Sequence, residues 1–168
     1  MIHLDTSQGE SNQAAIVRLL CDEMLQGIGR WLRAAGYDTA IARNGAQDEE
    51  LLAQARAGDR IVLTCDRGLA ARCAPAGVVL LATERLDEAA VALRERLAID
   101  WLHAPFSRCL LDNAPLRPAE PAALARLPER SRTGAGPITV CPECGRSYWP
   151  GSHVRRMRAR LERWRQTA

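Results

Sequence analysis

Residues 15–36 carry the sequence AIVRLLCDEMLQGIGRWLRAAG, in which two apolar patterns of different spacing flank a pair of acids. The run 15–21 is apolar except for one arginine, which predicts a largely buried β-strand. Over residues 24–35 the apolar side chains recur at the i, i+3, i+4, i+7 spacing of an amphipathic helix. Gly36 then suits the left-handed residue that commonly ends a helix. The stretch therefore predicts a strand followed by a helix, with the acids at their junction.

Strand-like and helix-like segments keep alternating up to residue 100. Further strands are predicted at 37–42, 60–64 and 78–81, and further helices at 47–57, 67–74 and 86–97. Alternation in units of about 20–25 residues is typical of a parallel sheet with helices on both faces. Continuous apolar strands also fit a sheet that is covered on both sides. We therefore expect an α/β domain at residues 16–100, after a flexible tail at 1–15.

The chain changes character after residue 100. Residues 104–137 hold six of the nine prolines, which predicts little regular structure there. A final helix is predicted at about 153–164, and we expect its apolar face to pack on the ribbon-like segment that precedes it. Residues 101–168 therefore form a second, small predicted domain. The apolar face of its helix consists of Val154, Met157, Leu161 and Trp164.

Composition excludes several classes of protein. With 168 residues, 47% hydrophobic and 26% charged, the chain has an ordinary globular composition. No window approaches the roughly 18 uninterrupted apolar residues of a membrane span. The polar start MIHLDTSQGESNQ lacks the basic and apolar segments of a secretory signal, so we expect a reducing, cytoplasmic location. There, six irregularly spaced cysteines indicate metal binding or core packing rather than disulfides.

The net charge of +3 is unevenly distributed along the chain. Residues 1–100 hold 11 Arg and 15 acids, whereas residues 101–168 hold 12 Arg and 5 acids. An acidic half can hold divalent metal, and a basic half can hold a polyanion such as RNA. A bias in composition is the alternative explanation, since all 23 basic residues are arginine.

Acids gather where predicted strands end and the next helices begin. In a parallel sheet with helices on both faces, these positions lie on one edge. Three or four carboxylates there suit Mg²⁺ or Mn²⁺, which prefer oxygen ligands. Such ions activate water and stabilise both oxygens of a phosphodiester displacement. The acids are Asp22, Glu23, Asp48, Glu49, Glu50 and Asp66.

Each of these acids also has an ordinary structural explanation. Asp22 and Asp66 are placed to cap the helices that follow them. Glu49 and Glu50 complement the dipole at the start of a helix. A phosphoacceptor receiver domain carries similarly placed acids, but it also needs a lysine on its last strand, and this chain contains none.

A cysteine pair in the second half indicates a metal site. Cys141-Pro-Glu-Cys144-Gly is a knuckle of two thiols three residues apart, of the kind that binds zinc. Upstream, Cys109-Leu-Leu-Asp112 has an aspartate where a second pair would have its second cysteine. Three thiolates and one carboxylate can ligate Zn²⁺, with His153 as an alternative fourth ligand, and a degenerate knuckle without metal is also compatible. The other cysteines, Cys21, Cys65 and Cys73, are expected to be small core residues.

The final helix is rich in arginine outside its apolar face. Guanidinium groups suit bidentate contacts to phosphate, so Arg155, Arg156 and Arg158 are candidate RNA contacts, although a solvated face would look the same. Tyr148 and Trp149 lie just before this helix. Their rings can stack on bases or pack in the core.

Five segments in this order resemble the Mut-seven C-terminal ribonuclease family, over about residues 16–165. They are LLCDEMLQGIGRWLRAAGYDT (19–39), QDEELLAQA (47–55), IVLTCDRGLA (61–70), PFSRCLLDNAPL (105–116) and CPECGRSYWPGSHVRRM (141–157). The resemblance implies a PIN-like nuclease domain followed by a zinc-ribbon-like domain, and a metal-dependent ribonuclease.

The resemblance also implies which residues carry the site. The family's motif acids fall on Asp22, Asp48 and Asp66, with Glu23 and Glu49 as possible extra acids, and its ribbon cysteines fall on Cys109, Cys141 and Cys144. The chain departs from the family pattern at Asp112, where the family has cysteine, which affects zinc affinity. It departs again at Cys65, where the family often has an arginine placed to help hold RNA.

We therefore expect a ribonuclease in which Asp22, Asp48 and Asp66 hold Mg²⁺ or Mn²⁺ and the basic half holds RNA. Arg30 and Arg33 on the first helix would steer the phosphate backbone or serve as surface charges. A non-catalytic RNA-binding adaptor is the alternative from another class. A PIN-type toxin is disfavoured, because such toxins usually lack an appended ribbon.

Overall fold

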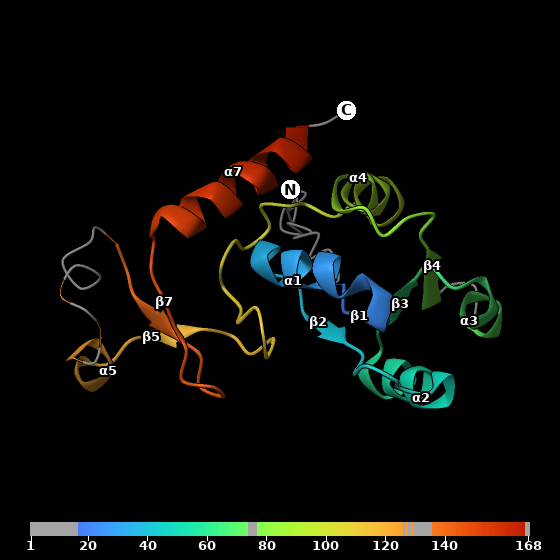
Figure 1. Cartoon of the computed structure of the whole chain (residues 1–168), viewed down its shortest axis with the longest axis horizontal. Helices are drawn as coiled ribbons and strands as arrows, with labels where there is room; N and C mark the ends of the chain where they lie inside the picture. The colour runs from blue at the N-terminus through green and yellow to red at the C-terminus, as the bar shows by residue number, and fades with distance from the viewer. Residues whose placement is uncertain (1–16, 74–76, 126, 128, 130–135, 167–168) are drawn as a thin grey trace, which may run out of the picture.

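A computed structural model describes residues 17–73, 77–125, 127, 129 and 136–166 (Figure 1). Its elements are β1 (Leu19–Cys21), the 3₁₀ helix η1 (Glu23–Leu25), α1 (Gln26–Ala35), β2 (Thr39–Ile41), α2 (Asp48–Gly58), β3 (Ile61–Thr64), α3 (Arg67–Arg72), β4 (Val78–Leu80), α4 (Leu86–Leu97), β5 (Arg117–Pro118), α5 (Pro121–Ala125), β6 (Thr139–Val140), β7 (Ser147–Tyr148) and α7 (Ser152–Gln166). A four-stranded parallel sheet has the order β2-β1-β3-β4, and a three-stranded antiparallel sheet has the order β5-β6-β7. The α/β fold with a parallel sheet flanked by helices is thus confirmed.

The parallel sheet is apolar on both faces, as its continuous hydrophobic strands predict. Within β1, Leu19 and Cys21 pack into one core cluster, whereas Leu20 between them packs into another. This division follows from the period of two along a strand. The first cluster is shared with α1 and α4, and the second with α2 and α3.

The order of the strands explains which helices cover which face. Crossovers between parallel strands are right-handed almost without exception. The chain steps from β1 to β2 in one direction, then crosses back past β1 to β3 and β4 in the other. The first crossover therefore places α1 on one face, and the later ones place α2 and α3 on the opposite face (Figure 1). The direction reverses between the neighbours β1 and β3, and in such sheets a crevice opens beyond the carboxyl ends of the two strands.

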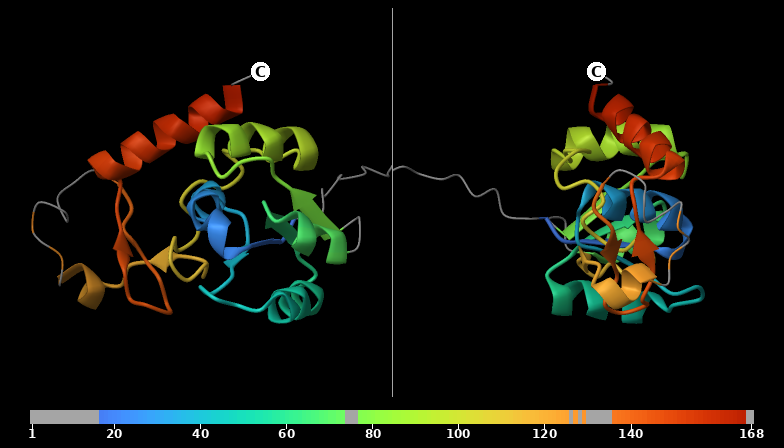
Figure 2. Two further views of the ribbon diagram at one scale, coloured as in Figure 1. Left: turned by 45° about the vertical axis from the view of Figure 1, so that its right-hand side comes forward. Right: turned by 90° about the vertical axis from the view of Figure 1, so that its left-hand side faces the viewer.

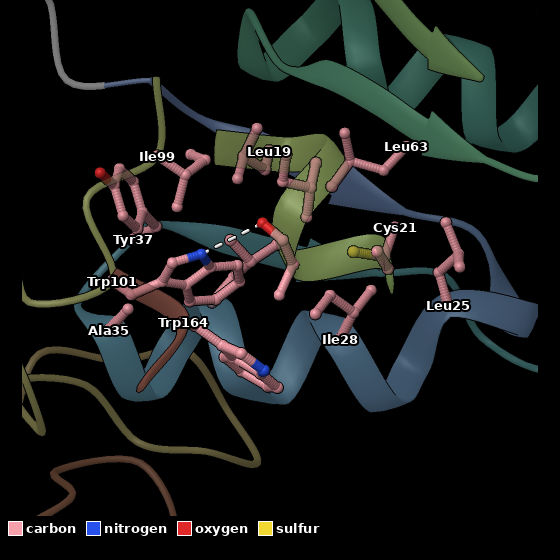
Figure 3. Packing of buried hydrophobic residues seen from close by; sticks show 14 of the residues in the cluster. Leu19, Cys21, Leu25, Ile28, Ala35, Tyr37, Leu63, Ile99, Trp101 and Trp164 are labelled. Atoms are coloured by element: carbon pink, nitrogen blue, oxygen red, sulfur yellow. Dashed lines mark hydrogen bonds between the residues drawn. The ribbon is translucent and has the colours of Figure 1, made fainter. Parts of the chain in front are cut away.

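The larger core cluster joins the two predicted domains. Trp101 follows α4 and Trp164 lies near the end of α7, and both are buried among residues of α1 and α4 (Figure 3). The two indole centroids are 4.9 Å apart, and Trp101 donates a 3.2 Å hydrogen bond from Nε1 to the carbonyl of Ala90. Trp164 also packs edge-on against Trp31 of α1. One apolar core therefore includes residues from both sides of residue 100.

The prediction that the last helix, α7, packs on the antiparallel ribbon is wrong. The helix forms, but its buried residues Leu161 and Trp164 lie against α1 and α4 rather than against the antiparallel ribbon. Figure 2 shows α7 running from the ribbon side across to α4. Its apolar stripe is long enough to reach a second surface, and the pattern of the stripe alone did not specify which surface covers it.

Polar contacts also join the segment after residue 100 to the parallel sheet. Asp38, just before β2, accepts hydrogen bonds of 2.7 Å from both Arg60 and the side-chain amide of Asn113. Arg60 donates further to the carbonyls of Leu19 and Asp38, both at 3.1 Å. Asn113 in turn accepts from the backbone N–H of Thr39 at 3.0 Å. The network ties residue 113 to the amino ends of β1 and β2.

Several predicted boundaries shift in the structure. The strand expected at 15–21 begins at Leu19, and the strand expected at 37–42 covers only Thr39–Ile41, because Tyr37 still bonds back to the end of α1. Gly36 ends α1 in the left-handed conformation as predicted, with φ of 102°. Residues 1–16 and 74, which include the expected flexible tail, lie outside the described residues. Among the helices that are described, none has the length and apolarity to cross a membrane.

Trp164→Ala is expected to lower the free energy of unfolding by about 3–5 kcal/mol, because it empties a buried indole site between α1, α4 and α7. Urea denaturation measures the change. Trp149→Ala is the matched control, since that indole is 39% exposed, and we expect a loss below about 1 kcal/mol. Equal losses in the two variants would contradict the docking of α7.

Acid is expected to destabilise the fold through Asp38. Burial raises the pKa of this carboxyl, but hydrogen bonds from Arg60 and Asn113 outweigh burial and lower the pKa to about 2, from an ordinary value of 3.8. Because the folded-state pKa is depressed, the stabilisation is complete above pH 3.8 and is lost as the pH falls towards 2. The loss amounts to about 2 kcal/mol.

Unfolding curves measured between pH 5 and pH 2 test this expectation. Asp38→Asn should lose most of the acid-dependent change that wild type shows, whereas Asp59→Asn, at an exposed helix end, should keep it. An identical acid profile for wild type and Asp38→Asn would refute the role of Asp38.

Candidate functional site

A small pocket of about 100 Å³ lies at the crevice beyond β1 and β3, and we call it the acid pocket. Its lining includes Asp22 after β1, Asp48 at the start of α2 and Asp66 after β3. The structure thus brings together the three aspartates that the sequence places at one sheet edge. Glu23 also lines the acid pocket, whereas Glu49 does not.

Asp22 and Asp66 both cap helices, as their ordinary structural explanation predicts. Asp22 Oδ1 accepts the backbone N–H of Leu25 at 3.1 Å, at the start of η1. Asp66 Oδ1 accepts the N–H groups of Gly68 at 2.6 Å and Leu69 at 3.1 Å, at the start of α3. Capping and pocket lining coexist, because the cap uses one oxygen of each carboxylate and a carboxylate oxygen that accepts one hydrogen bond keeps a further lone pair.

Thr64 connects the two capped aspartates. Its hydroxyl accepts the backbone N–H of Asp66 at 2.9 Å and donates to Asp22 Oδ2 in a short hydrogen bond. The side chain of Thr64 is completely buried at the end of β3. A buried hydroxyl with both hydrogen-bonding roles satisfied fixes the orientation of Asp22 relative to the turn that carries Asp66.

Arg72 of α3 holds the acids of α2. It donates to Asp48 Oδ2 at 2.8 Å and forms a shorter contact with Glu49. Hydrogen bonding to Arg72 lowers the pKa of Glu49. Glu49 is therefore turned to the rim, where it pairs with Arg72 outside the acid pocket.

The acid pocket is open rather than a closed cage. Glu23 accepts the backbone N–H of Gly45 at 2.5 Å, and the exposed side chains of Met24 and Arg43 complete the rim. Among the described residues, these carboxylates do not converge into a compact ligand group of the kind formed by the cysteine cluster below. An open set of oxygen donors fits a hydrated cation such as Mg²⁺, which keeps several waters and uses one or two carboxylates.

A second cluster brings four potential metal ligands close together. The ligand atoms of Cys109, Asp112, Cys141 and Cys144 all lie within 4.8 Å of one another. The Sγ atoms of Cys109 and Cys144 are 3.9 Å apart, and Asp112 Oδ2 lies 3.3 Å from the Sγ of Cys109 and 3.4 Å from that of Cys141. Tetrahedral zinc with ordinary bond lengths requires about 3.8 Å between sulfurs and about 3.5 Å between sulfur and oxygen. The cluster can therefore hold one metal ion.

The surroundings act in opposite directions on the members of the cysteine cluster: hydrogen bonding to Asp112 raises the pKa of the Cys144 thiol to about 12, whereas the pKa values of Cys109 and Asp112 are lowered. Burial raises the pKa of the Cys109 thiol, but hydrogen bonds from Tyr148 and from the backbone of Asp112 outweigh burial and lower it. Contacts with the thiols of Cys144 and Cys109 lower the pKa of Asp112. The fourth member of the cluster is Asp112, and His153 is not part of the cluster formed by the described residues.

The prediction that Arg33 on α1 contacts RNA or serves as a surface charge is wrong. Its side chain is buried, and it donates to the carbonyl of Thr39 at 2.7 Å and to those of Leu110 at 2.9 Å and Leu111 at 2.6 Å. Burial lowers the pKa of its guanidinium. Neither the RNA role nor the surface-charge role fits a group so enclosed. Arg30 is exposed on the same helix, and its RNA role stays a prediction.

The arginines of α7 fall into two groups. Arg158 lies 5.3 Å from the ring centroid of Phe106, and Arg160 lies over Trp31 and Trp164 while pairing with Asp87 at 3.0 Å. By contrast, Arg155 and Arg156 are exposed, and their guanidinium groups have no side-chain partner in the described part of the chain. The first turns of α7 are therefore the part with unused positive charge.

Sequence reasoning did not identify Thr64, Arg72 or Met24 as parts of the site. For Thr64 a signal existed, because a threonine at the end of a predicted strand lies two positions before the helix-capping Asp66, where its hydroxyl can bond to a nearby backbone group. Arg72 lies at the end of α3, 24 residues from Asp48, and only the packing of α2 beside α3 brings the two together.

Comparisons with known proteins identify the family of this chain. Residues 17–161 match the model of a protein family described as the Mut7-C RNAse domain. A human protein named "Exonuclease mut-7 homolog" is 32% identical over 114 residues, which cover 61% of this chain and 13% of the human protein. The chain therefore spans only a small part of that relative. No solved structure matches the chain.

Proposed function

The chain belongs to the Mut7-C RNase domain family, and we propose that it is a metal-dependent ribonuclease whose Mg²⁺ or Mn²⁺ site is the acid pocket. The observation that carries the proposal is the meeting of Asp22, Asp48 and Asp66 in one pocket, from three separate segments. The pocket lies at the switch point of the sheet, where α/β proteins bind their ligands.

In the proposed mechanism the protein holds the carboxylates of Asp22, Asp48 and Asp66 in place as ligands for the metal ion. Bound Mg²⁺ or Mn²⁺ would supply activation of water and neutralisation of charge on the phosphodiester. Thr64 and the Leu25 N–H hold both oxygens of Asp22, while the start of α3 holds one oxygen of Asp66. Because backbone N–H groups and the buried Thr64 hydroxyl fix these carboxylates, little reorganisation is needed when a cation arrives. Asp48 is held instead by the guanidinium of Arg72. A guanidinium binds phosphate as well as carboxylate, so Arg72 can leave Asp48 and contact a phosphate of the substrate.

We further propose that the cysteine cluster binds Zn²⁺ and has a structural role. Its ligands come from two turns far apart in sequence, at 109–112 and 141–144. The donor set of three sulfurs and one oxygen suits zinc. An ion there would join the antiparallel ribbon to the segment that Arg33 and Asn113 fasten to the sheet.

RNA is the proposed substrate, on the basis of the family and of the unused arginines of α7. An adaptor that binds RNA without cutting it would share the same basic surface. Cleavage and binding must therefore be measured separately.

Asp66→Asn is expected to reduce Mn²⁺-dependent cleavage of labelled single-stranded RNA by at least about 100-fold. The amide oxygen of asparagine can still cap α3, so the fold should survive while the charge is lost. Asp59→Asn, at the exposed end of α2, is the matched control and should cleave as wild type does. Chelation of the divalent ion should abolish cleavage in wild type.

Retention of full cleavage by Asp66→Asn would rule out the acid pocket as the catalytic site. Binding of RNA by wild type with no cleavage in Mn²⁺ or Mg²⁺ would favour the adaptor instead. Thermal unfolding of both variants shows whether any loss of activity reflects loss of fold.

Purified protein is expected to contain about one zinc per chain. Asp112→Cys should slow the removal of zinc by a chelator, because thiolate is a softer ligand than carboxylate, and Asp112→Ala should speed it. Elemental analysis and a chromogenic chelator measure content and rate. Zinc-free wild-type protein whose stability is unaffected by added Zn²⁺ would overturn the zinc assignment.

A further inference from the structure

A shallow hollow of about 250 Å³ lies where β7 leads into α7. Its lining includes Tyr148, Trp149 and His153, and it contains no acidic residue. The volume is slightly below the roughly 300–1,000 Å³ of pockets that enclose whole small ligands. The hollow therefore suits a single flat ring system that enters from solvent.

Trp149 differs from the other three tryptophans, because Trp31 and Trp101 both pack against Trp164. Trp101 and Trp164 are buried and donate hydrogen bonds from their indole nitrogens, but Trp149 is 39% exposed. Within the described residues, the indole N–H of Trp149 makes no hydrogen bond. Packing among the rings thus accounts for the other three tryptophans, and among the described residues Trp149 has no such packing partner.

A sharp turn at residues 149–151 leaves room for the Trp149 ring beside the backbone. Gly151 donates its N–H to the carbonyl of Trp149 at 2.7 Å, which turns the chain sharply. A Cβ added at Gly151 would lie 3.2 Å from the indole nitrogen and 3.5 Å from Cδ1. The absence of a side chain at Gly151 therefore allows the ring to lie along the backbone. Tyr148 beside it is anchored by a 3.2 Å hydrogen bond from the N–H of Leu110.

Positive charge without an internal partner begins at the same place. Arg155 and Arg156 follow His153 on the first turns of α7, and both are exposed. Farther along, Arg160 and Arg165 pair with Asp87 and Asp100. An aromatic platform next to unpaired guanidinium groups is the combination by which proteins bind single-stranded nucleic acid.

We propose that this hollow is a subsite for single-stranded RNA, in which a nucleobase stacks on Trp149 and the neighbouring phosphates contact Arg155 and Arg156. The inference rests on the proposed function, because that function supplies RNA as the ligand. Stacking on an indole tolerates any base, since every base has a π-face. The subsite would therefore add affinity without sequence specificity.

The subsite is separate from the acid pocket. β7 and the start of α7 lie on one side of the molecule, and the starts of α2 and α3, which border the acid pocket, lie on the other (Figures 1 and 2). A very short RNA cannot contact both places. The subsite should therefore matter for long substrates and not for short ones.

Fluorescence anisotropy of a labelled oligouridylate of roughly 20 nucleotides, without added divalent cation, tests the subsite. Trp149→Ala should weaken binding by about 5- to 10-fold, and Trp149→Phe should restore most of the affinity. Replacing Arg155 and Arg156 together by Gln should make the salt dependence shallower by about 1.4 in the log–log slope. Arg85→Gln, at the solvent-exposed start of α4, is the charge control and should leave the affinity nearly unchanged.

Circular dichroism and thermal unfolding confirm that each variant is folded. Wild-type affinity in Trp149→Ala, or no RNA binding by wild type, would overturn the subsite even if the protein cleaves RNA. Binding that depends on Trp149 without any cleavage would support the subsite and reject the proposed ribonuclease. Where wild type cleaves, Trp149→Ala should slow cleavage of the long RNA by about the same 5- to 10-fold at RNA concentrations below the Kd and leave cleavage of a tetranucleotide unchanged. Equal losses on both substrates would contradict the separation of the two sites.

Discussion

The buried guanidinium of Arg33 is the contact on which the assembly of the two parts depends. It is carried by α1, and its hydrogen bonds reach the start of β2 and two successive carbonyls in the turn that carries Cys109 and Asp112. A buried charge is costly unless its donors are satisfied. The chain meets this requirement with backbone carbonyls, which cannot be lost by mutation. The position of the cysteine cluster relative to the sheet follows from this requirement.

Charge adds a second reason for Arg33 to lie there. Cys109 and Asp112 both act on it electrostatically and favour its charged form. A cluster of three thiolates and a carboxylate would remain negative overall even with a divalent ion bound. An arginine next to such a cluster offsets part of that negative charge in a region of low dielectric. The same side chain can therefore fasten the turn and support ligand ionisation.

The contrast between Arg33 and the aspartates shows what a sequence can predict. Asp22 and Asp66 could be located because a strand end and a helix start are local patterns, and the topology of a parallel sheet brings such ends together. Arg33 occupies an ordinary position on a helix, three residues after the exposed Arg30, and nothing local separates the two. Their difference arises from residues 110 and 111, more than 70 positions away. The docking of α7 on α1 and α4 could not be predicted either. An apolar stripe shows that a helix face is buried, but not which other element it packs against.

Net charge is consequently a poor measure of the surface available to RNA. Residues 101–168 are strongly basic, but Arg160 and Arg165 pair with carboxylates and Arg158 lies against an aromatic ring. These contacts serve the docking of α7, which places the helix against the core. Within α7, the guanidinium groups left without a side-chain partner among the described residues are those of Arg155 and Arg156, at the end of the helix that follows Trp149. The C-terminal part of α7 thus packs on the core through the buried Trp164. Its N-terminal turns remain free of the core and carry the arginines proposed to contact RNA.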